Sequence, residues 1–250
     1  MLSTLNMAAE WYKDWFDTNY YHLLYDGRDM AEAEDFLDRL AEHLKIPANS
    51  RIVDIGCGRG RHSIYLNKLG FDVTGIDLAG KSIDEARKFE NEGLHFYRHD
   101  NRNVFKEAYF DYAFNLFTSF GYLETRKDLL KQLIRMRDNL KVSGIFVLDY
   151  FNSETVKECD FVKQHLIKND ISFEIEKRVE GHQVIKTIEV EDAGKSSAFQ
   201  EVVHLITEKE FRELFSDAGL EILHTFGNYR LEEFNPDVSE RLIITSRRIT

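Results

Sequence analysis

The most informative stretch of the sequence is a glycine-dense turn that follows a short apolar segment. It reads Val53-Asp54-Ile55-Gly56-Cys57-Gly58-Arg59-Gly60-Arg61-His62-Ser63. The β-branched residues before the glycines favour a strand, and the glycines allow positive φ values and a close approach of a ligand to the main chain. A strand-to-helix turn alone needs only one glycine, so we interpret these residues as a binding loop.

The chemistry around this turn favours one kind of ligand over another. A dinucleotide-binding turn has the spacing G-x-G-x-x-G and receives a pyrophosphate at the start of a helix. Here the spacing is G-x-G-x-G, Arg61 stands at the third glycine position of that motif, and no P-loop lysine follows. Asp54 precedes the turn, where its carboxylate would repel a phosphate but attract an ammonium or sulfonium group. The turn therefore favours a cationic amino-acid cofactor, and an NAD-dependent oxidoreductase is the less favoured alternative.

Polar side chains also follow two neighbouring apolar segments. Asp77, with Leu78 next to it, comes after 72–76, and Asp100-Asn101 comes after 94–97. A carboxylate at the end of a second strand can accept both hydroxyl groups of a ribose, and the Asp-Asn pair could bind an adenine amino group. Each of these residues taken alone is more typical of a solvated turn. Because ligands of open α/β sheets lie across the carboxyl ends of the strands, the combination predicts a single binding site.

The elements that must position these residues alternate between strand and helix. The pattern predicts a helix over 30–44, helices from about 61 and from 83, and a helix over 127–140. Ser82 and Glu85 match a capping box for the helix at 83. Strands are expected at 51–55, 72–76, 94–97, 110–116 and 145–148. Such a succession predicts a parallel sheet with right-handed crossovers.

The pattern changes after residue 152. Strands at 171–179, 184–190 and 199–206 follow one another without helices, which predicts an antiparallel insertion. Thr207 and Glu210 form a second capping-box pattern, and strands at 220–226 and 241–245 end the chain. We therefore predict four segments, which are a helical cap (1–46), a cofactor-binding α/β core (47–152), an antiparallel insertion covering the substrate (153–206), and a last helix with the final core strands (207–250).

In these motifs and their order, the chain resembles class I S-adenosylmethionine-dependent methyltransferases of the small-molecule type. The resemblance lies in VDIGCGRGRHS, VTGIDLAGKSIDEAR, HDN, FDYAFNLFTSFGYL, LKVSGIFVLDYFN and the tail TEKEFRELFSDAGLEILHTFGNY. It implies a Rossmann-like α/β fold, with a doubly wound, seven-stranded, mostly parallel sheet. An N-terminal helical lid and the antiparallel β insertion would be added to this sheet. One departure is Ala79-Gly80, where relatives usually have Ser-Pro.

The resemblance also implies roles for individual residues. The three glycines would hold the methionine portion of S-adenosyl-L-methionine, Asp77 the ribose, and Asp100 with Asn101 the adenine, while Asn115 and Phe117 would lie near the sulfonium. The full set of expected cofactor-binding residues in the core is Asp54, Gly56, Cys57, Gly58, Gly60, Asp77, Leu78, Asp100, Asn101, Asn115 and Phe117.

The N-terminal region is unusually aromatic. Its rings belong to Trp11, Tyr12, Trp15, Phe16, Tyr20, Tyr21 and Tyr25. Such rings more often contribute to core packing. Our hypothesis, suggested by relatives that resemble this pattern, is that part of the region folds over the cofactor as a lid and places Tyr21 and Arg28 near it.

Transfer of a methyl group from a sulfonium is an in-line displacement, so the protein mainly aligns donor and acceptor and excludes water. The expected substrate-pocket residues are Phe120, Tyr122, Tyr150 and His204. The sequence identifies no catalytic base, and it leaves open whether the acceptor atom is nitrogen, oxygen or a carboxylate. A non-catalytic S-adenosylmethionine-binding protein is the main alternative.

Composition narrows the choice of partner. The 250 residues include 33 basic and 44 acidic side chains, and the net charge of -11 repels nucleic-acid backbones and anionic lipids. The segment 115–119 also lacks the Pro-Pro signature of methyltransferases that act on nucleic-acid amino groups. The two cysteines do not have the spacing of a disulfide framework or a zinc site. We expect a cytoplasmic monomer or homodimer that acts on a small molecule or peptide, without nucleic acid, metal, signal peptide or membrane span.

Overall fold

The computed structural model describes residues 11–25, 30–157 and 161–249, which form two compact units. The larger unit contains 30–157 and 206–249, and the smaller contains 11–25 and 161–205. These boundaries differ from those of the four predicted segments, because the predicted N-terminal cap is divided between the two units. Its aromatic first part belongs with the insertion, whereas the helix that follows belongs with the core.

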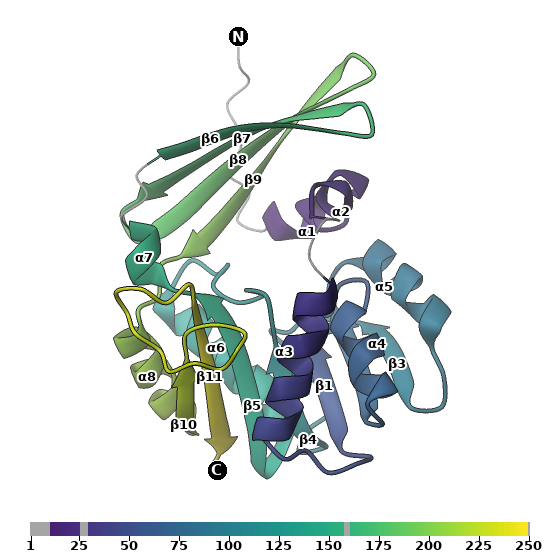
Figure 1. Ribbon diagram of the computed structural model, residues 1–250, viewed down its shortest axis with the longest axis vertical. Helices are drawn as coiled ribbons and strands as arrows, with labels where there is room; N and C mark the ends of the chain where they lie inside the picture. Colours follow the sequence, from purple (N-terminus) through teal and green to yellow (C-terminus); the bar gives the residue numbers. More distant parts are fainter. Residues whose placement is uncertain (1–10, 26–29, 158–160, 250) are drawn as a thin grey trace. The chain divides into compact units, whose positions relative to one another are not determined.

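The larger unit is built on a seven-stranded sheet with the strand order β10-β11-β5-β4-β1-β2-β3 (Figure 1). Strands β1 to β5 pair in parallel, and β11 is antiparallel to both of its neighbours. The predicted Rossmann-like sheet is therefore confirmed. Its strands are β1 (Arg51–Ile55), β2 (Asp72–Asp77), β3 (Leu94–Arg98), β4 (Phe110–Asn115), β5 (Leu140–Phe151), β10 (Leu220–Phe226) and β11 (Arg241–Arg248).

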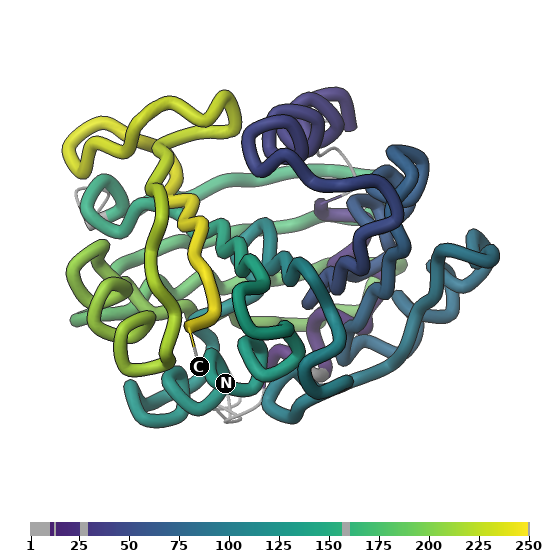
Figure 2. Tube along the Cα trace, turned by 90° about the horizontal axis from the view of Figure 1, so that it is seen from below, coloured from purple at the N-terminus to yellow at the C-terminus, as the bar shows by residue number. Residues whose placement is uncertain are grey.

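Helices cover both faces of this sheet. Figure 2 shows α3 and the loop 227–240 on one side of the sheet and α6 and α8 on the other. On the first side, Phe36 and Leu37 of α3 and Leu66 of α4 are fully buried against strand residues such as Val147. The helices are α3 (Met30–His43), α4 (Arg61–Lys68), α5 (Gly80–Ala86), α6 (Arg126–Asp138), α7 (Ser153–Lys157) and α8 (Glu208–Asp217), with a 3-10 turn at Arg87–Phe89.

The smaller unit is an antiparallel sheet in the order β6-β7-β8-β9, with two short helices packed on it. Trp15 and Leu24 are buried with Phe173 and Ile188 of the sheet, so the N-terminal rings do contribute to a core. The sequence pattern predicts β7, β8 and β9 but misses β6, whose side chains are mostly exposed. The elements are α1 (Trp11–Trp15), α2 (Asn19–Tyr25), β6 (Phe161–Lys168), β7 (Ile171–Glu180), β8 (Gln183–Asp192) and β9 (Lys195–His204).

One of the two predicted capping boxes is present. Thr207 accepts from the amide of Glu210, and the Glu210 side chain accepts from the amide of Thr207. The box predicted at Ser82 is wrong, because α5 begins at Gly80 after Ala79, which has no side-chain cap. Asp77 Oδ1 accepts the Ala79 amide at 2.8 Å, which starts the helix earlier than the sequence pattern predicts.

Candidate functional site

The predicted cofactor residues of the core meet at one edge of the sheet. The amides of Gly56 and Cys57, just beyond β1, donate to the carbonyl of Ile76 at the end of β2, at 2.8 and 3.1 Å. The amide of His99, just beyond β3, donates to the carbonyl of Asp77 at 2.8 Å. The carboxyl ends of β1, β2 and β3 are thereby joined through the main chain, and Asp100 follows directly.

The three glycines of the turn all have positive φ values, of 79° at Gly56, 55° at Gly58 and 80° at Gly60. A Cβ on Gly60 would lie 2.6 Å from the ring of Phe96, and one on Gly56 would lie 2.8 Å from Ser119 Oγ. A Cβ on Gly58 would meet no described atom within 4 Å. Two of the glycines thus allow close packing within the protein, whereas Gly58 faces open space where a ligand can approach the backbone.

Asp77 holds this turn in place. Its Oδ2 accepts the amide of Gly58 at 2.8 Å, while Oδ1 accepts the amide of Ala79. A carboxylate has about four lone-pair positions, and one at the end of the second strand can also accept the hydroxyl groups of a ribose. The carbonyl of the neighbouring Leu78 accepts from Arg98 Nε at 3.2 Å, so the main chain at this end of β2 is well ordered by hydrogen bonds.

Asp54 lies inside the protein beneath the turn, with 1% of its surface exposed. Its Oδ2 accepts the hydroxyl of Ser63 in α4 at 2.6 Å. Burial raises the pKa of Asp54 to about 6, although the Ser63 hydrogen bond opposes the shift. Burial also raises the pKa of the Cys57 thiol well above its usual value, and Asp54 adds to this effect. Near neutral pH the site therefore contains a buried carboxylate beside an uncharged thiol.

Asn115, at the end of β4, is fully buried. Its Nδ2 donates to the carbonyl of Ile55 at 2.7 Å, which ties β4 to the start of the glycine turn. Its Oδ1 has no hydrogen-bond partner within the described residues. A buried acceptor without a partner is costly, and a cationic or hydroxyl group of a ligand would remove that cost.

The pair predicted to hold adenine already has partners. The carboxylate of Asp100 accepts Arg102 Nε at 2.9 and 3.0 Å and forms an ion pair with the same guanidinium. Asn101 Oδ1 accepts from Gln132 Nε2 of α6 at 2.7 Å. Their place after β3 agrees with the expected site, and their role toward adenine stays a prediction.

The turn after β4 brings in residues that the sequence analysis did not select. Phe117 stacks on His62 of α4 with 4.7 Å between ring centroids, and on Tyr229 of the β10–β11 loop with 5.2 Å. The amide of Phe117 donates to Asp149 Oδ2 of β5 at 2.8 Å, and Asp149 pairs with Arg241 of β11. Asp149 could have been noticed as a carboxylate within an apolar strand, but nothing in the sequence identifies its partner.

The predicted substrate-pocket residues are divided between the two units, with three in the larger unit and His204 in the smaller. Phe120 and Tyr150 are fully buried, and both rings pack against Phe211 of α8. The hydroxyl of Tyr122 donates to the carbonyl of Thr118. His204 belongs to β9 of the smaller unit. The assignment of these four residues to a substrate pocket stays a prediction.

The lid predicted from the sequence is based on Tyr21 and Arg28. Tyr21 lies in α2 of the smaller unit, where its ring contacts Trp15 and Phe16. Arg28 lies outside the described residues.

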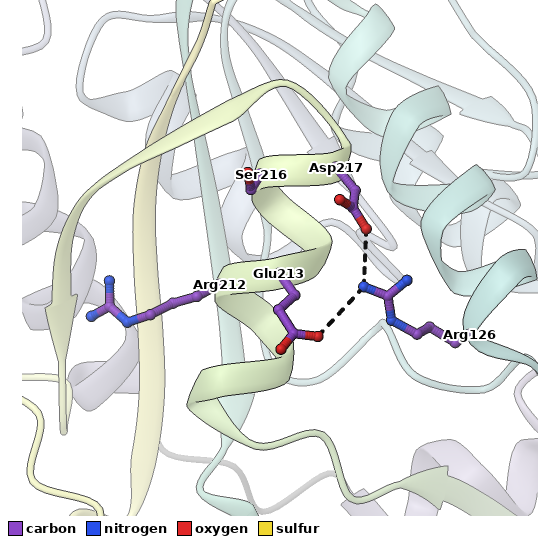
Figure 3. A pocket seen from close by; sticks show the side chains of 5 residues that line it. All are labelled: Arg126, Arg212, Glu213, Ser216 and Asp217. Carbon is purple, nitrogen blue, oxygen red and sulfur yellow. Dashed lines mark hydrogen bonds and ion pairs between the residues drawn. The ribbon is translucent and has the colours of Figure 1, made fainter.

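A surface hollow between α6 and α8 contains none of the predicted residues (Figure 3). Arg126 pairs there with Asp217 at 3.0 Å and with Glu213 at 3.7 Å, while Arg212 points away from them (Figure 3). About half of each of these three paired side chains is exposed, so the pairs contribute little stability.

In the described part of the chain, no helix is both long and apolar enough to cross a membrane. The same residues include no group of three or more His, Cys, Asp or Glu side chains arranged to hold a metal ion.

The geometry of the edge fits the cofactor that the sequence resemblance implies. S-adenosylmethionine carries an ammonium and a sulfonium group, and both favour the negative field of Asp54 and Asp77. The open side of Gly58 and the unpartnered Asn115 Oδ1 offer places where its amino-acid portion would bind. Asp77 would hold the ribose. A pyrophosphate at the turn would be repelled by Asp54.

Comparison with known proteins agrees with this fold. Residues 25–225 match the family model described as a methyltransferase domain. An N,N-dimethyltransferase of dTDP-3-amino-3,4,6-trideoxy-alpha-D-glucopyranose from Streptomyces venezuelae is 28% identical over 83% of this chain and 91% of that enzyme. A glycine/sarcosine N-methyltransferase from Parasynechococcus marenigrum is 29% identical over 88% of this chain and 79% of that enzyme.

A solved structure shares the fold. The S-adenosylmethionine-bound amino pentose methyltransferase CalS10 from Micromonospora echinaspora superposes with a TM-score of 0.67 and 23% identity, over 92% of this chain and 97% of CalS10. The matched family and the relatives define a methyltransferase. The chain belongs to the methyltransferase-domain family, and the predicted class of S-adenosylmethionine-dependent methyltransferase is confirmed.

Proposed function

We propose that this chain transfers the methyl group of S-adenosylmethionine to an amino group of a small molecule. The observation that carries the proposal is the edge where two carboxylates, Asp54 and Asp77, border a glycine turn that is open at Gly58. Such an edge favours a cationic methyl donor. The cofactor supplies an activated methyl group, and the residues of the chain bind it, orient it and exclude water from it.

The relatives support an amine as the acceptor. Both curated enzymes reported above have names that denote N-methylation of small amino compounds. An uncharged amine carries its own lone pair and needs little help from a base, which agrees with the absence of an identified base in the sequence. The net charge of -11 further supports a small acceptor over a nucleic acid.

Two measurements, made one after the other, test the proposal. Calorimetry with S-adenosylmethionine, S-adenosylhomocysteine and NAD should give binding for the first two only. Mass spectrometry after incubation with amino sugars and short amino acids should then show methylated products, and hydroxyl analogues of the same compounds serve as matched controls. Methylation of the hydroxyl analogues alone would refute the amine acceptor. Tight binding of NAD without binding of either sulfur nucleoside would refute the class of cofactor.

We also propose that the smaller unit selects the acceptor, which is an argument from fold analogy. His204→Ala in β9 should raise KM for the acceptor and leave the Kd of the cofactor unchanged. His165→Ala is the matched control, because His165 lies on the edge strand β6 and pairs with Glu174 at 2.6 Å. Equal acceptor KM values for the two variants would count against this role.

We also propose the N-terminal lid, because relatives resemble this chain in their N-terminal pattern. Tyr21→Phe and Arg28→Ala should each weaken binding of S-adenosylhomocysteine, whereas Tyr20→Phe should not, because the Tyr20 hydroxyl already donates to Asp192 at 2.9 Å. If neither of the first two variants changes the affinity, the lid proposal is wrong.

A further inference from the structure

The turn that follows β4 contains two adjacent residues in a conformation that L-amino acids rarely adopt. Phe117 has a φ of 56° and Thr118 a φ of 61°, and neither residue is a glycine. The left-handed conformation costs roughly 1–2 kcal/mol for each such residue. For a bulky or β-branched residue this conformation persists only where the surrounding structure holds it, and strain of this kind is concentrated at functional sites.

Asp149 in β5 provides most of that support. Its Oδ2 accepts the amide of Phe117 at 2.8 Å, and its main-chain carbonyl accepts the amide of Thr118 at 3.1 Å. The Asp149 side chain has no exposed surface. The amides of both left-handed residues are therefore bound by one buried residue, which fixes the path of the turn.

Arg241 in β11 completes the arrangement. Its Nε donates to Asp149 Oδ1 at 2.8 Å, and its Nη2 donates to the Thr118 hydroxyl at 3.1 Å. The desolvation of a buried ion pair largely offsets its Coulomb attraction, so such a pair contributes little net stability. The Asp149–Arg241 pair instead fixes the positions of the Phe117 and Thr118 groups that it binds.

The turn after β4 in turn contacts residues that lie next to the glycine turn. The Phe117 ring stacks on His62 in the first turn of α4 and on Tyr229, whose hydroxyl donates to Asp149 Oδ2 at 3.3 Å. Ser119, two residues further on, lies so close to Gly56 that a Cβ there would be 2.7 Å from the Ser119 Cβ. A shift of the strained turn would therefore move side chains that border the cofactor-binding glycines.

We propose that Asp149, together with Arg241, is a positioning residue of the cofactor site. The pair holds Phe117 and Thr118 in the left-handed conformation and thereby fixes Phe117 and Ser119 against the glycine turn. This inference rests on the proposed function, because it assigns the turn a role in binding the sulfur nucleoside.

The test compares Asp149→Asn with Asp111→Asn in the full chain. Asp111 is a suitable control, since it also bridges strands through an ion pair, with Lys141 at 2.6 Å, but lies at the opposite end of β4. We expect Asp149→Asn to weaken S-adenosylhomocysteine binding by on the order of tenfold and to accelerate hydrogen exchange at the Phe117 and Thr118 amides. The control should lower the midpoint of urea denaturation without either effect.

Two further variants keep the inference falsifiable. Thr118→Gly added to Asp149→Asn should recover part of the lost affinity, because glycine adopts the left-handed conformation at little cost. Arg241→Lys keeps the charge and loses the bond to Thr118, so it should show a smaller effect of the same kind, and it replaces Asp149→Asn if that variant does not fold.

The possible failures are distinct. Equal affinity of Asp149→Asn and wild type for S-adenosylhomocysteine, with only a lower denaturation midpoint, would overturn the positioning role. Unchanged exchange at the two amides would do the same. A wild-type protein that binds neither sulfur nucleoside would instead refute the proposed function.

Discussion

The carboxylate of Asp77, at the end of β2, accepts the backbone amide of Gly58 at 2.8 Å. This bond links the residue predicted to hold a ribose with the only glycine of the turn whose missing side chain leaves open space. The shape of the loop therefore depends on the same carboxylate that is proposed to bind the ligand, and both effects can be measured.

Asp77→Asn should weaken S-adenosylhomocysteine binding by on the order of tenfold, because one of the two carboxylate oxygens becomes a donor. Calorimetry measures the affinity. Asp72→Asn is the matched control, since it makes the same change at the other end of β2. Equal losses in the two variants would show that the site does not depend on Asp77.

Gly58→Ala should abolish or strongly weaken cofactor binding while the protein stays folded. Alanine at a φ of 55° costs roughly 1–2 kcal/mol of stability, and its methyl group would occupy the open side of the turn.

Gly181→Ala is the control for Gly58→Ala, because Gly181 has a φ of 58° and no described atom within 4 Å of its Cβ position. Urea denaturation should give similar stability losses for both variants, and only Gly58→Ala should lose affinity. If both bind S-adenosylhomocysteine equally well, the open side of Gly58 is not part of the site.

Asp54→Asn should change stability and affinity in opposite directions. Since burial raises the pKa of Asp54 to about 6, the folded protein binds its proton more tightly than the unfolded chain does. The wild type should therefore lose stability relative to the variant as pH rises from about 4 to about 6, by at most roughly 3 kcal/mol. Urea denaturation across this range measures the difference, and a constant difference would contradict the raised pKa.

The same variant tests the electrostatic argument for the cofactor. Asparagine removes the negative field beneath the turn, so S-adenosylmethionine, which carries the additional sulfonium charge, should lose more affinity than S-adenosylhomocysteine. Equal losses for the two compounds would mean that the carboxylate does not act on the sulfonium.

Thr207→Ala should lower the free energy of unfolding by about 1 kcal/mol, because it removes the side-chain cap of α8. Cofactor affinity should be unchanged, since none of the cofactor residues lies in this helix. Denaturation and calorimetry on the same preparation check both statements, and an altered affinity would indicate coupling between α8 and the site.

The sequence predicts those features that depend on local patterns. The glycine turn is recognisable because three glycines follow a β-branched strand, and the Thr207 capping box because both of its partners lie within one helical turn. The start of α5 differs from the prediction, because the helix begins after Ala79 without a side-chain cap and so carries no local signal in the sequence. The strand expected at 145–148 is longer than the pattern indicates, because β5 already begins at Leu140.

Features formed by distant residues could not be predicted in this way. Asp149 and Arg241 are 92 positions apart, and only the fold brings them together. The grouping of α1 with the insertion depends in the same way on a bond from Trp15 Nε1 to Glu201 at 2.7 Å, across 186 positions. The hydrophobic periodicity of α1 or of the insertion does not indicate that the two segments pack together.

The smaller unit is formed from two segments that are far apart in the sequence, which affects the order in which the protein can fold during translation. Glu201 is synthesised roughly 10 to 40 seconds after Trp15 at ordinary elongation rates, and all five parallel strands of the other unit are made in between. The aromatic side chains of α1 and α2 therefore have no sheet to pack against while β1 to β5 are translated. The core that they share with the sheet is complete only after β9 has been made.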